Sequence, residues 1–500
     1  MGSGKKIVSG VVWTTLLNII NAVYGFIAVP ILINHFGKAE YGLIGLAMSI
    51  NVYMQLMDMG FNNTNIRFFS NWLAKGENEN VNKGFQTSLS FYGIIGFLNA
   101  LILIGMSMFS NSIFNVTTEQ DVILKNLFYI LAISAFFSWY TSCFDQLIKA
   151  TENVAWIQRI SIVPKILMMG VLFLTVYGNL SIELYYILTC LATFSMLPVH
   201  IWKIRKETPF ISFKPQIDIT LLKLMLPYCL NIFSFAIFQF SFYNLRPVFL
   251  GIQGSAESVA DYRILNGIVG IVTMVGGAFM GALIPSTSKI IAQNNSTAFY
   301  KVAYDGTKYI SIVLCFCCFG MMAIGKELLT IYVGKQYLYL IPWLNLWLIC
   351  TLGTHNQSIS SLILASDDIR AISYSSVFAS LVGLFFAWYL IPLYGVGGTV
   401  IAFAIYLLIQ LAFYYLYYWP TVMKINSLRI FRYSFFPYVL AGIIAFFFAQ
   451  VEFLNCKILY LSIFLKGFCF FLIYMFGICV IMKKEGLSSL ITLIKTKNEK

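Results

Sequence analysis

The chain of 500 residues is 59% hydrophobic and only 11% charged, with a formal net charge of +13. A soluble domain carries about 25% charged residues, so this composition excludes a water-exposed globular fold. The apolar residues form continuous runs of about 20 residues, which suit helices that cross a bilayer and not the alternating strands of a membrane barrel.

These runs predict about fourteen membrane helices. In chain order they lie near residues 8–33, 41–61, 85–109, 123–147, 156–177, 184–202, 225–250, 260–284, 307–325, 339–364, 372–391, 396–418, 433–450 and 458–482. The first run is too long for a cleaved signal peptide, so we expect it to remain in the mature chain.

The charges of the loops predict the orientation. With the N-terminus inside, twenty-four Lys and Arg residues fall in inner segments and four in outer loops, namely Lys38, Lys326, Lys335 and Lys457. Cytoplasmic loops carry such an excess of basic residues. We therefore expect a multi-pass protein of the cell inner (plasma) membrane with both termini cytoplasmic. Because this loop bias accounts for most of the positive charge, we expect no nucleic acid partner.

Two internal matches predict a duplication. Residues 147–154 resemble residues 362–369 at an offset of 215 positions, and residues 30–37 match residues 247–254 at an offset of 217. Both pairs fall at helix junctions. They favour two six-helix bundles of the same orientation, with a substrate cleft at their interface.

The predicted organisation has five parts. They are an N-terminal six-helix bundle (1–202), a cytoplasmic linker (203–224), a C-terminal six-helix bundle (225–418), two further helices (419–482) and a cytoplasmic tail (483–500). The linker is the longest polar break in the interior of the chain and contains Pro209 and Pro215.

Four short motifs carry a family resemblance. They are Phe36–Gly42 (FGKAEYG), Asp58–Phe61 (DMGF) leading to Arg67, Val259–Arg263 (VADYR) and Gly334–Tyr337 (GKQY). With these motifs and its six-plus-six build, the chain resembles the multidrug/oligosaccharidyl-lipid/polysaccharide exporter superfamily, and within it the Wzx-type flippases of O-antigen and capsule repeat units.

The resemblance covers nearly the whole chain and implies a MATE-like fold. It also implies that the protein moves a polyprenyl-diphosphate-linked oligosaccharide to the outer leaflet by alternating access, as a step of lipopolysaccharide or other polysaccharide biosynthesis. Besides the lipid bilayer, a polysaccharide polymerase and glycosyltransferases are the implied partners.

Catalytic and cofactor signatures are absent from the sequence. His35, His200 and His355 lie far apart without metal-ligand spacing. The segment from Gly320 to Lys326 nearly matches a phosphate-binding loop but is followed by Glu327 in place of Ser or Thr. The sequence thus predicts a transporter without a cofactor or a metal, and not an enzyme.

Cations inside membrane helices are candidates for substrate binding, because each costs ~2.5–3.5 kcal/mol near the bilayer centre. Arg246 and Arg263 lie near the outer ends of the seventh and eighth helices, and Lys165 lies in the fifth. Arginine binds phosphate through bidentate hydrogen bonds, so this set predicts a diphosphate site. The alternatives are a rim salt bridge with Glu257 or Asp261, and a Lys165 that extends to the inner surface.

Uncharged polar residues inside helices are candidates for binding sugar hydroxyls. They are His355 and Asn356 in the tenth helix and Asn18 and Asn21 in the first. The alternative is that they bridge neighbouring helices.

Acidic residues are weaker candidates, for coupling to a proton or a cation. They are Asp58, Asp145 and Asp261. Asp58 could instead pair with Arg67, and Asp145 could pair with Lys149 four residues later on the same helix.

Rival functions remain open. A drug or cation antiporter of the same superfamily is expected to have twelve helices and an acidic cleft, whereas fourteen helices and a cationic set favour an anionic lipid-linked substrate. A membrane polymerase is disfavoured because the longest outer loop, near 325–338, is too short for a catalytic domain. A flippase of teichoic-acid precursors belongs to the favoured class.

Overall fold

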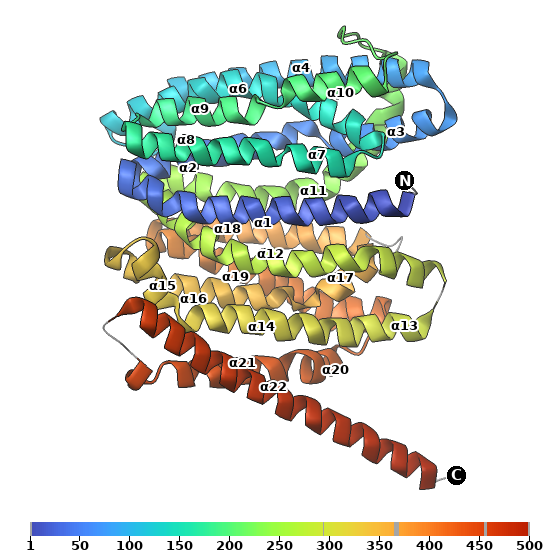
Figure 1. Cartoon of the computed structure of the whole chain (residues 1–500), viewed down its shortest axis with the longest axis vertical. Coiled ribbons are helices and arrows are strands. Elements are labelled where there is room, and N and C mark those ends of the chain that lie inside the picture. Colours follow the sequence, from blue (N-terminus) through green and yellow to red (C-terminus); the bar gives the residue numbers. More distant parts are fainter. Residues whose placement is uncertain (1–2, 294, 365–369, 455–457, 499–500) are drawn as a thin grey trace. The chain divides into compact units, whose positions relative to one another are not determined.

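The computed structural model describes residues 3–293, 295–364, 370–454 and 458–498, and among them it contains helices and no β-strand (Figure 1). These residues belong to two compact units. The first unit is Met1–Gly267 with Leu384–Thr399, and the second is Ile268–Gly383 with Val400–Lys500. The five-part division and the duplication expected from the sequence stay predictions.

Twelve helices in the described part of the chain are long and apolar enough to cross a membrane. They confirm the predicted class, an all-helical multi-pass membrane protein. The count of fourteen spans is not confirmed. The predicted run at 41–61 is broken in the structure by η1, whereas the run at 225–250 lies within one continuous helix, α11 (Ile219–Gln253).

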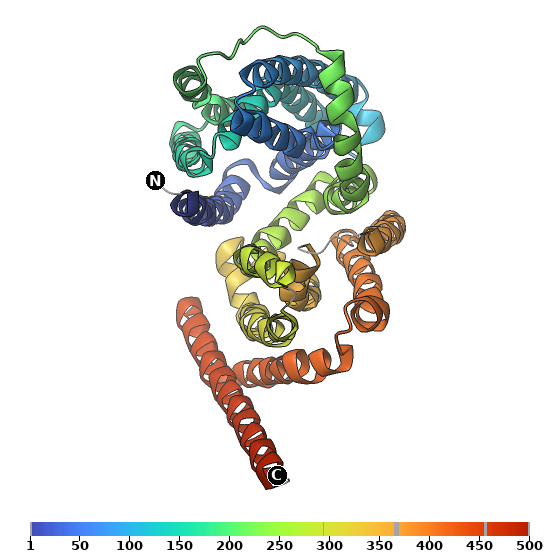
Figure 2. The same cartoon turned by 90° about the vertical axis from the view of Figure 1, so that its right-hand side faces the viewer.

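The first unit contains the helices up to the first turns of α12. They are α1 (Ser3–Phe36), α2 (Lys38–Met54), η1 (Gln55–Asp58), α3 (Phe61–Lys75), α4 (Asn78–Met108), α5 (Ser110–Ile113), α6 (Thr118–Ala150), α7 (Val154–Ile160), α8 (Ile162–Gly178), α9 (Ile182–Phe194), α10 (Leu197–Glu207), α11 (Ile219–Gln253) and the start of α12 (Ala256–Ala292). Figure 2 shows most of these helices end on, packed as a bundle.

The break between α2 and α3 follows from two residues with left-handed backbone. Met59 has a φ of 50° and Gly60 a φ of 82°, a region that glycine enters without steric cost. The helix tightens into the 3-10 turn η1 before this point and restarts at Phe61. Asp58 is therefore held at an interruption of the helix and not in its middle.

The interior of the first unit is aromatic. Phe61 and Phe69 of α3, Phe85 and Tyr92 of α4 and Trp139 of α6 belong to one buried cluster. Fully burying such a side chain contributes roughly 1.5–3 kcal/mol relative to leaving it exposed. The cluster fixes α3, α4 and α6 against one another and so positions the polar groups described below.

Glycines bring α2 close to the start of α12. A Cβ atom at Gly42 would lie 1.8 Å from the carbonyl oxygen of Ala256, a distance that no side chain tolerates. Small residues allow this close approach between membrane helices. The motif FGKAEYG thus has a packing role in the first unit.

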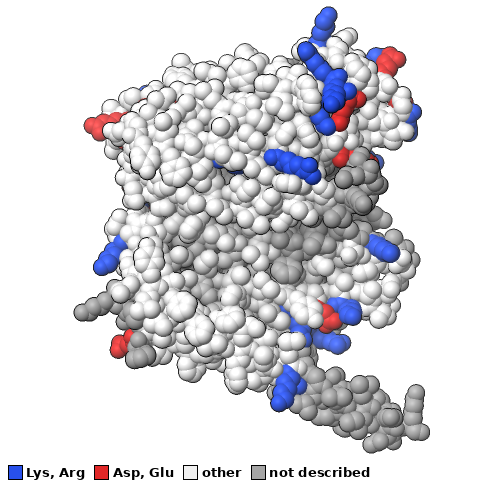
Figure 3. Space-filling view, viewed as in Figure 1, with Lys and Arg blue, Asp and Glu red and all other residues white. Residues whose placement is uncertain are grey.

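Charged side chains of the first unit gather at helix ends. Figure 3 shows Lys and Arg concentrated on this unit near the ends of α3 and α10, while the flanks of its helices are almost free of charge. Lys203 and Lys206 lie in the last turns of α10, and Lys214 lies in the segment that joins α10 to α11. This end of the unit is the one that the loop charges predict to be cytoplasmic.

The second unit contains the remainder of the helices. They are the rest of α12, α13 (Ser296–Lys301), η2 (Val302–Gly306), α14 (Thr307–Ala323), α15 (Gly325–Tyr332), η3 (Lys335–Leu340), α16 (Ile341–Thr351), η4 (Leu352–Asn356), α17 (Gln357–Leu364), α18 (Arg370–Tyr394), α19 (Val396–Phe413), η5 (Tyr414–Val422), α20 (Ser427–Arg429), η6 (Ile430–Phe435), α21 (Phe436–Ala449), η7 (Glu452–Leu454) and α22 (Leu459–Asn498). Residues 384–399 of α18 and α19 belong to the first unit.

A buried ion pair fastens α22 within the second unit. The Nζ atom of Lys466 lies 2.6 Å from a carboxylate oxygen of Glu327 on α15, and both side chains are less than a tenth exposed. The hydroxyl of Ser462 donates a hydrogen bond to the same oxygen at 3.4 Å. Lys466 is thus engaged in packing between helices.

Candidate functional site

Arg263 lies inside the first unit among residues of α2 and α9. Its Nε atom donates to the hydroxyl of Tyr41 at 3.5 Å, and its Nη2 atom lies 3.7 Å from the sulfur of Met48. Tyr185 and Tyr186 on α9 lie near the guanidinium. Three helices thus contribute to one site: α2, α9 and the first turns of α12, which carry Arg263.

Lys165 of α8 continues this arrangement. Its Nζ atom lies 5.9 Å from the ring centroid of Tyr24 on α1 and 3.8 Å from the sulfur of Met168. The hydroxyls of Tyr24 and Tyr185 lie 3.5 Å apart. Three tyrosines therefore connect the two cations. We refer to Tyr24, Tyr41, Lys165, Tyr185 and Arg263 as the cation–tyrosine cluster.

Neither cation of this cluster has an acidic partner among the described residues. Arg263 forms no ion pair there with Glu257 or Asp261, and Asp261 pairs with Lys38 at 2.8 Å. Lys165 likewise contacts no carboxylate in the described part of the chain. The cluster holds two positive charges beside three tyrosines, an arrangement that can accept an anion because tyrosine hydroxyls donate hydrogen bonds as well.

Arg246 of α11 has different surroundings. The side chain is buried, with a residue exposure of 2%, and its guanidinium carbon lies 5.0 Å from the ring centroid of Phe242, 5.6 Å from that of Tyr243 and 5.7 Å from that of Tyr262. Aromatic faces stabilise a guanidinium by cation–π attraction. Its expected contact with a diphosphate stays a prediction.

Asn18 and Asn21 lie on α1, close in sequence to the cluster. Asn18 is exposed, and Asn21 is half-buried with a side-chain oxygen that has no hydrogen-bond partner in the described part of the structure. Asn21 precedes Tyr24 by three residues, which places both side chains on one face of the helix. Their role in sugar binding stays a prediction.

Asp58 is held by hydrogen bonds from uncharged groups. Its carboxylate accepts from the Tyr92 hydroxyl at 2.6 Å and from the backbone N–H of Asn62 at 3.1 Å. The alternative pairing with Arg67 is not observed among the described residues, because the Arg67 guanidinium lies over the ring of Tyr228, 4.3 Å from its centroid.

A relay of hydrogen bonds supports Asp58 from behind. Gln146 donates to the Tyr92 hydroxyl at 2.6 Å, Asn65 donates to the Gln146 carbonyl at 2.7 Å, and Ser88 donates to the Asn65 carbonyl at 3.0 Å. A buried network whose members are all satisfied is rigid. The relay fixes the Asp58 carboxylate where α2 is interrupted.

Asp145 lies near a histidine and not near the lysine considered from the sequence. Its Oδ1 atom is 3.7 Å from Nδ1 of His200 on α10, and no ion pair with Lys149 is present in the described part of the chain. Helix spacing alone suggested the pair with Lys149, whereas packing of α6 against α10 supplies the observed neighbour.

His355 and Asn356 lie in η4 of the second unit, and both are buried. The Nδ1 atom of His355 lies 2.9 Å from the carbonyl of Leu352, and its Nε2 atom lies 2.6 Å from the Tyr415 hydroxyl. The ring also stacks on Phe435 with a centroid distance of 4.0 Å. Both ring nitrogens are engaged, which fits the alternative that His355 bridges helices.

The sequence did not predict the tyrosines of the cation–tyrosine cluster as site residues. Tyr is abundant, with 30 residues in the chain, so composition does not single out Tyr24 or Tyr185. Tyr41 stands in the motif FGKAEYG, and that is the one available signal. Among the described residues, no group of three or more His, Cys, Asp and Glu side chains could hold a metal ion.

Comparison with protein families decides the affiliation. The sequence profile of the family described as "Polysaccharide biosynthesis protein" matches residues 7–291, more than half of the chain. This chain belongs to that family. A search of curated protein sequences found no match.

Solved structures share the fold across most of the chain. The lipid II flippase MurJ in an inward closed conformation has a TM-score of 0.73 at 14% identity, covering 94% of this chain and 99% of its own. An inward-facing multidrug resistance MATE family transporter of the MOP superfamily has a TM-score of 0.64 at 13% identity, covering 78% and 92%.

A further similar structure is the MATE multidrug transporter DinF-BH, with a TM-score of 0.60, 16% identity and coverage of 83% and 95%. At these identities the likeness establishes the fold alone. The chain thus belongs to the polysaccharide biosynthesis family that its motifs resemble, and it has the MATE-like fold that this resemblance implies.

Proposed function

We propose that this protein is a flippase that moves a polyprenyl-diphosphate-linked oligosaccharide, such as a repeat unit of O-antigen or capsule, from the cytoplasmic to the outer leaflet. Family membership supports a role in polysaccharide biosynthesis. The shared fold with a lipid II flippase supports a lipid-linked substrate. In this proposal both termini are cytoplasmic, and glycosyltransferases supply the substrate that a polymerase consumes.

One observation carries the proposal, namely the pair of cations in the cation–tyrosine cluster. Arg263 and Lys165 have no acidic partner in the described part of the chain; Arg263 donates to the Tyr41 hydroxyl, and Lys165 lies over the ring of Tyr24. Both residues are partly buried, and a charge withdrawn from water is unfavourable unless it is paired, so an incoming anion stabilises the cluster. A diphosphate offers several oxygens to the guanidinium and the ammonium at once.

The rest of the substrate explains why a protein is needed. Moving an unpaired hydroxyl into hydrocarbon costs ~4–8 kcal/mol, and an oligosaccharide carries many. We propose that two six-helix bundles, 8–202 and 225–418, open alternately to the two sides and hold the sugars in a wet cleft. An inside-negative potential favours outward movement of the diphosphate by ~2.3 kcal/mol per charge per 100 mV.

A second candidate is a drug or cation antiporter. It is favoured by the fold shared with multidrug transporters and by the Asp58 carboxylate, which has no cationic partner among the described residues. A flippase of teichoic-acid precursors differs from the main proposal only in the sugar or polyol that it carries.

The test is translocation by the purified full-length protein in proteoliposomes. The probe is undecaprenyl diphosphate bearing N-acetylglucosamine with a fluorescent label, whose exposure is followed by a membrane-impermeant quencher. We expect transport that falls ~10–100-fold in Arg263→Gln and Lys165→Gln, because each loses a charged hydrogen-bond donor. Arg246→Ala reports whether the third predicted cation contributes.

Matched controls are Arg205→Gln and Lys83→Gln, which remove cations at the surface. Arg205 is exposed, and Lys83 pairs with Glu79 at 2.6 Å. Both should transport normally. If the wild-type protein binds and moves ethidium but not the lipid, the antiporter is the better function. Normal transport in the Arg263 and Lys165 variants would show that the cluster does not bind the substrate.

A further inference from the structure

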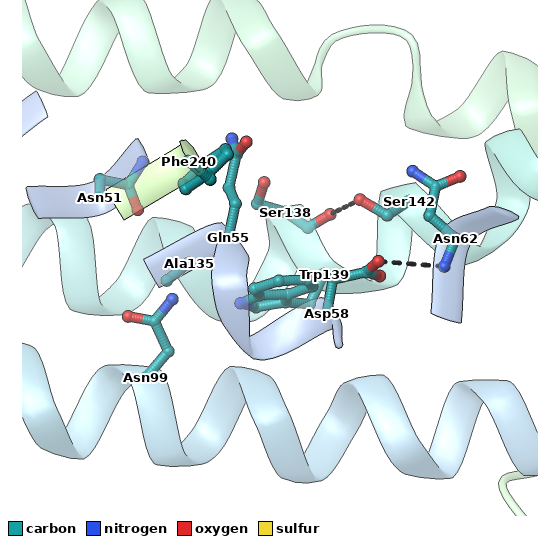
Figure 4. Close-up of a pocket in the computed structure, with 10 residues that line it drawn as sticks. All are labelled: Asn51, Gln55, Asp58, Asn62, Asn99, Ala135, Ser138, Trp139, Ser142 and Phe240. Carbon is teal, nitrogen blue, oxygen red and sulfur yellow. Dashed lines mark hydrogen bonds between the residues drawn. The ribbon is translucent and has the colours of Figure 1, made fainter. Parts of the chain in front are cut away.

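A polar cavity of about 320 Å³ lies inside the first unit, beside the break between α2 and α3 (Figure 4). It is bounded by residues of α2, η1, α3, α4, α6 and α11. Gln55 and Ser138 at its border are exposed, whereas Asn99 and Trp139 are buried, so the cavity has a mouth and a floor. We call it the polar cavity.

The lining of this cavity is rich in carboxamides. Asn51, Gln55, Asn62 and Asn99 each present an amide that can both donate and accept. Asp58 is the one charged residue in the lining, and no basic residue accompanies it. Such a mixture suits neither a phosphate, which needs donors and positive charge, nor a hydrophobic drug.

Asn99 gives the cavity a buried hydrogen-bond acceptor that a ligand could satisfy. The residue is 2% exposed, and its side-chain oxygen has no hydrogen-bond partner in the described part of the structure. Leaving such a buried acceptor unpaired is unfavourable, because it has lost its contacts with water and gained none in return. A hydroxyl group inside the cavity would satisfy it.

Packing and hydrogen bonds hold the walls of the polar cavity in place before any ligand binds. Trp139 stacks on Tyr92 with a centroid distance of 5.6 Å and an interplanar angle of 17°, and the hydroxyl of Tyr92 holds Asp58. Figure 4 shows Asp58 and Trp139 among the side chains that border the cavity. Side chains that are locked by packing and hydrogen bonds lose little entropy when a ligand binds.

The polar cavity and the cation–tyrosine cluster share one face of α2. Arg263 contacts Tyr41 and Met48 on this helix. Asn51 and Gln55 follow Met48 by three and seven residues, the spacing of one helix face. At 1.5 Å per residue they lie ~4.5 and ~10.5 Å farther along the axis.

We infer that the polar cavity is a subsite for an uncharged sugar, the one that lies next to the diphosphate in the transported lipid. The inference rests on the proposed function and adds the class of sugar. Hydroxyls of a neutral hexose or N-acetylhexosamine exchange hydrogen bonds with the carboxamides and the Asp58 carboxylate. The indole of Trp139 supplies an apolar wall for the ring. An acidic sugar is repelled by Asp58.

Size separates this ligand from a bare cation. A metal ion is coordinated by oxygens at about 2.0–2.6 Å and would leave most of the cavity unfilled. Water occupies roughly 30 Å³ per molecule, so the free cavity holds on the order of ten waters, which a sugar displaces while it replaces their hydrogen bonds.

The experiment measures binding of short lipid analogues to the full-length protein in detergent. The probes are farnesyl diphosphate and farnesyl diphosphate bearing glucose, galactose, N-acetylglucosamine or glucuronic acid. In the wild type, at least one neutral sugar should tighten binding about tenfold relative to farnesyl diphosphate, through added hydrogen bonds. Glucuronic acid should not.

Two variants remove the gain in different ways. Asn99→Leu replaces the buried amide with an apolar side chain of the same branching and number of heavy atoms. The pair Asn51→Ala with Gln55→Ala changes residues that are not fully buried and so threatens folding less. Both should abolish the gain from the sugar and keep the affinity for farnesyl diphosphate. Asn63→Ala is the matched control, because Asn63 is exposed and lies outside the lining.

An unchanged gain in both variants would overturn the inference, as would a wild type that binds farnesyl diphosphate yet gains nothing from any neutral sugar. Failure of the proposed function looks different. Farnesyl diphosphate itself would then bind no more tightly to the wild type than to Arg263→Gln, and the sugar subsite would fall with it.

Discussion

Gly45 of α2 leaves the space that the side chain of Arg263 fills, since a Cβ atom at Gly45 would lie 2.3 Å from the Arg263 Cδ atom. The contact links α2, shortly after the motif FGKAEYG, to a cation of the cation–tyrosine cluster. The position of the guanidinium thus depends on a residue that carries no functional group.

Gly45→Ala should therefore weaken diphosphate binding without unfolding the protein. The flexible Arg263 side chain can move away from the added methyl group, but its guanidinium then leaves Tyr41. We expect farnesyl diphosphate affinity to fall several-fold, because ~1 kcal/mol corresponds to a factor of about five. Binding measured by isothermal titration calorimetry, beside a melting curve, tests this.

Two glycines serve as comparisons. Gly105→Ala adds a methyl group where nothing lies within 4 Å, so neither affinity nor melting temperature should change. Gly42→Ala meets the backbone oxygen of Ala256 at 1.8 Å and should lower the melting temperature. If Gly45→Ala instead behaves as Gly105→Ala does, Arg263 does not depend on this contact.

The buried pair of Lys466 and Glu327 predicts an effect on stability. Lys466→Met leaves the Glu327 carboxylate buried without its cation and should destabilise the second unit by ~3–5 kcal/mol. Adding Glu327→Leu removes the orphaned charge and should restore most of that loss. Melting temperatures of the single and double variants in detergent decide between the two results.

A transport assay tests whether Lys466 and Glu327 also act in substrate movement. Because Lys466 is engaged with Glu327, the double variant should carry substrate at the wild-type rate per folded molecule. A double variant that is stable but does not transport would show that the Lys466–Glu327 pair takes part in transport.

Orientation is the next prediction. Reporter fusions at Gly178 and Tyr394, the last residues of α8 and α18, should report the outer side, while a fusion at Glu207, the last residue of α10, should report the cytoplasm. The reason is the excess of Lys and Arg in the loops that the sequence assigns to the inside. A reporter at Glu207 that faces outward would invalidate both the helix count and the proposed repeat.

Much of the fold could be predicted because apolar length is a local property. The run at 85–109 lies within α4 but for one residue, and the run at 123–147 lies wholly within α6. The break in the run at 41–61 was missed, although Gly60 stands in the motif DMGF, because a glycine inside an apolar run does not by itself reveal a left-handed backbone.

The site was predictable only in part, for the same physical reason. Arg263 and Lys165 could be named from the cost of charge in a membrane, but their tyrosine neighbours come from α1, α2 and α9 and depend on packing. Likewise the polar cavity joins Asn51, Asn99 and Ser138 from three helices. No spacing within one helix could indicate that combination.

The final prediction concerns the charge of the sugar. Asp58 is the one charged side chain in the lining of the polar cavity, and its carboxylate is held by Tyr92 and Asn62. Two negative charges ~6 Å apart repel by ~3 kcal/mol at an effective dielectric constant near 20. The wild type should therefore bind farnesyl-diphospho-glucuronic acid more weakly than the glucose analogue.

Asp58→Asn should reduce that preference while leaving the fold intact. Asparagine keeps an oxygen that accepts from the Tyr92 hydroxyl, so the relay from Gln146 remains satisfied and the repelling charge is gone. Its NH2 group replaces the oxygen that accepts from the Asn62 N–H, and the loss of that hydrogen bond costs about 1–3 kcal/mol. We expect the ratio of the two affinities to fall by roughly tenfold, part of the repulsion being screened by solvent. Glu79→Gln, which removes an exposed carboxylate at the surface, should leave the ratio unchanged. An unaltered ratio in Asp58→Asn would mean that the sugar does not enter the cavity beside Asp58, and its selection would then have to occur elsewhere along the path.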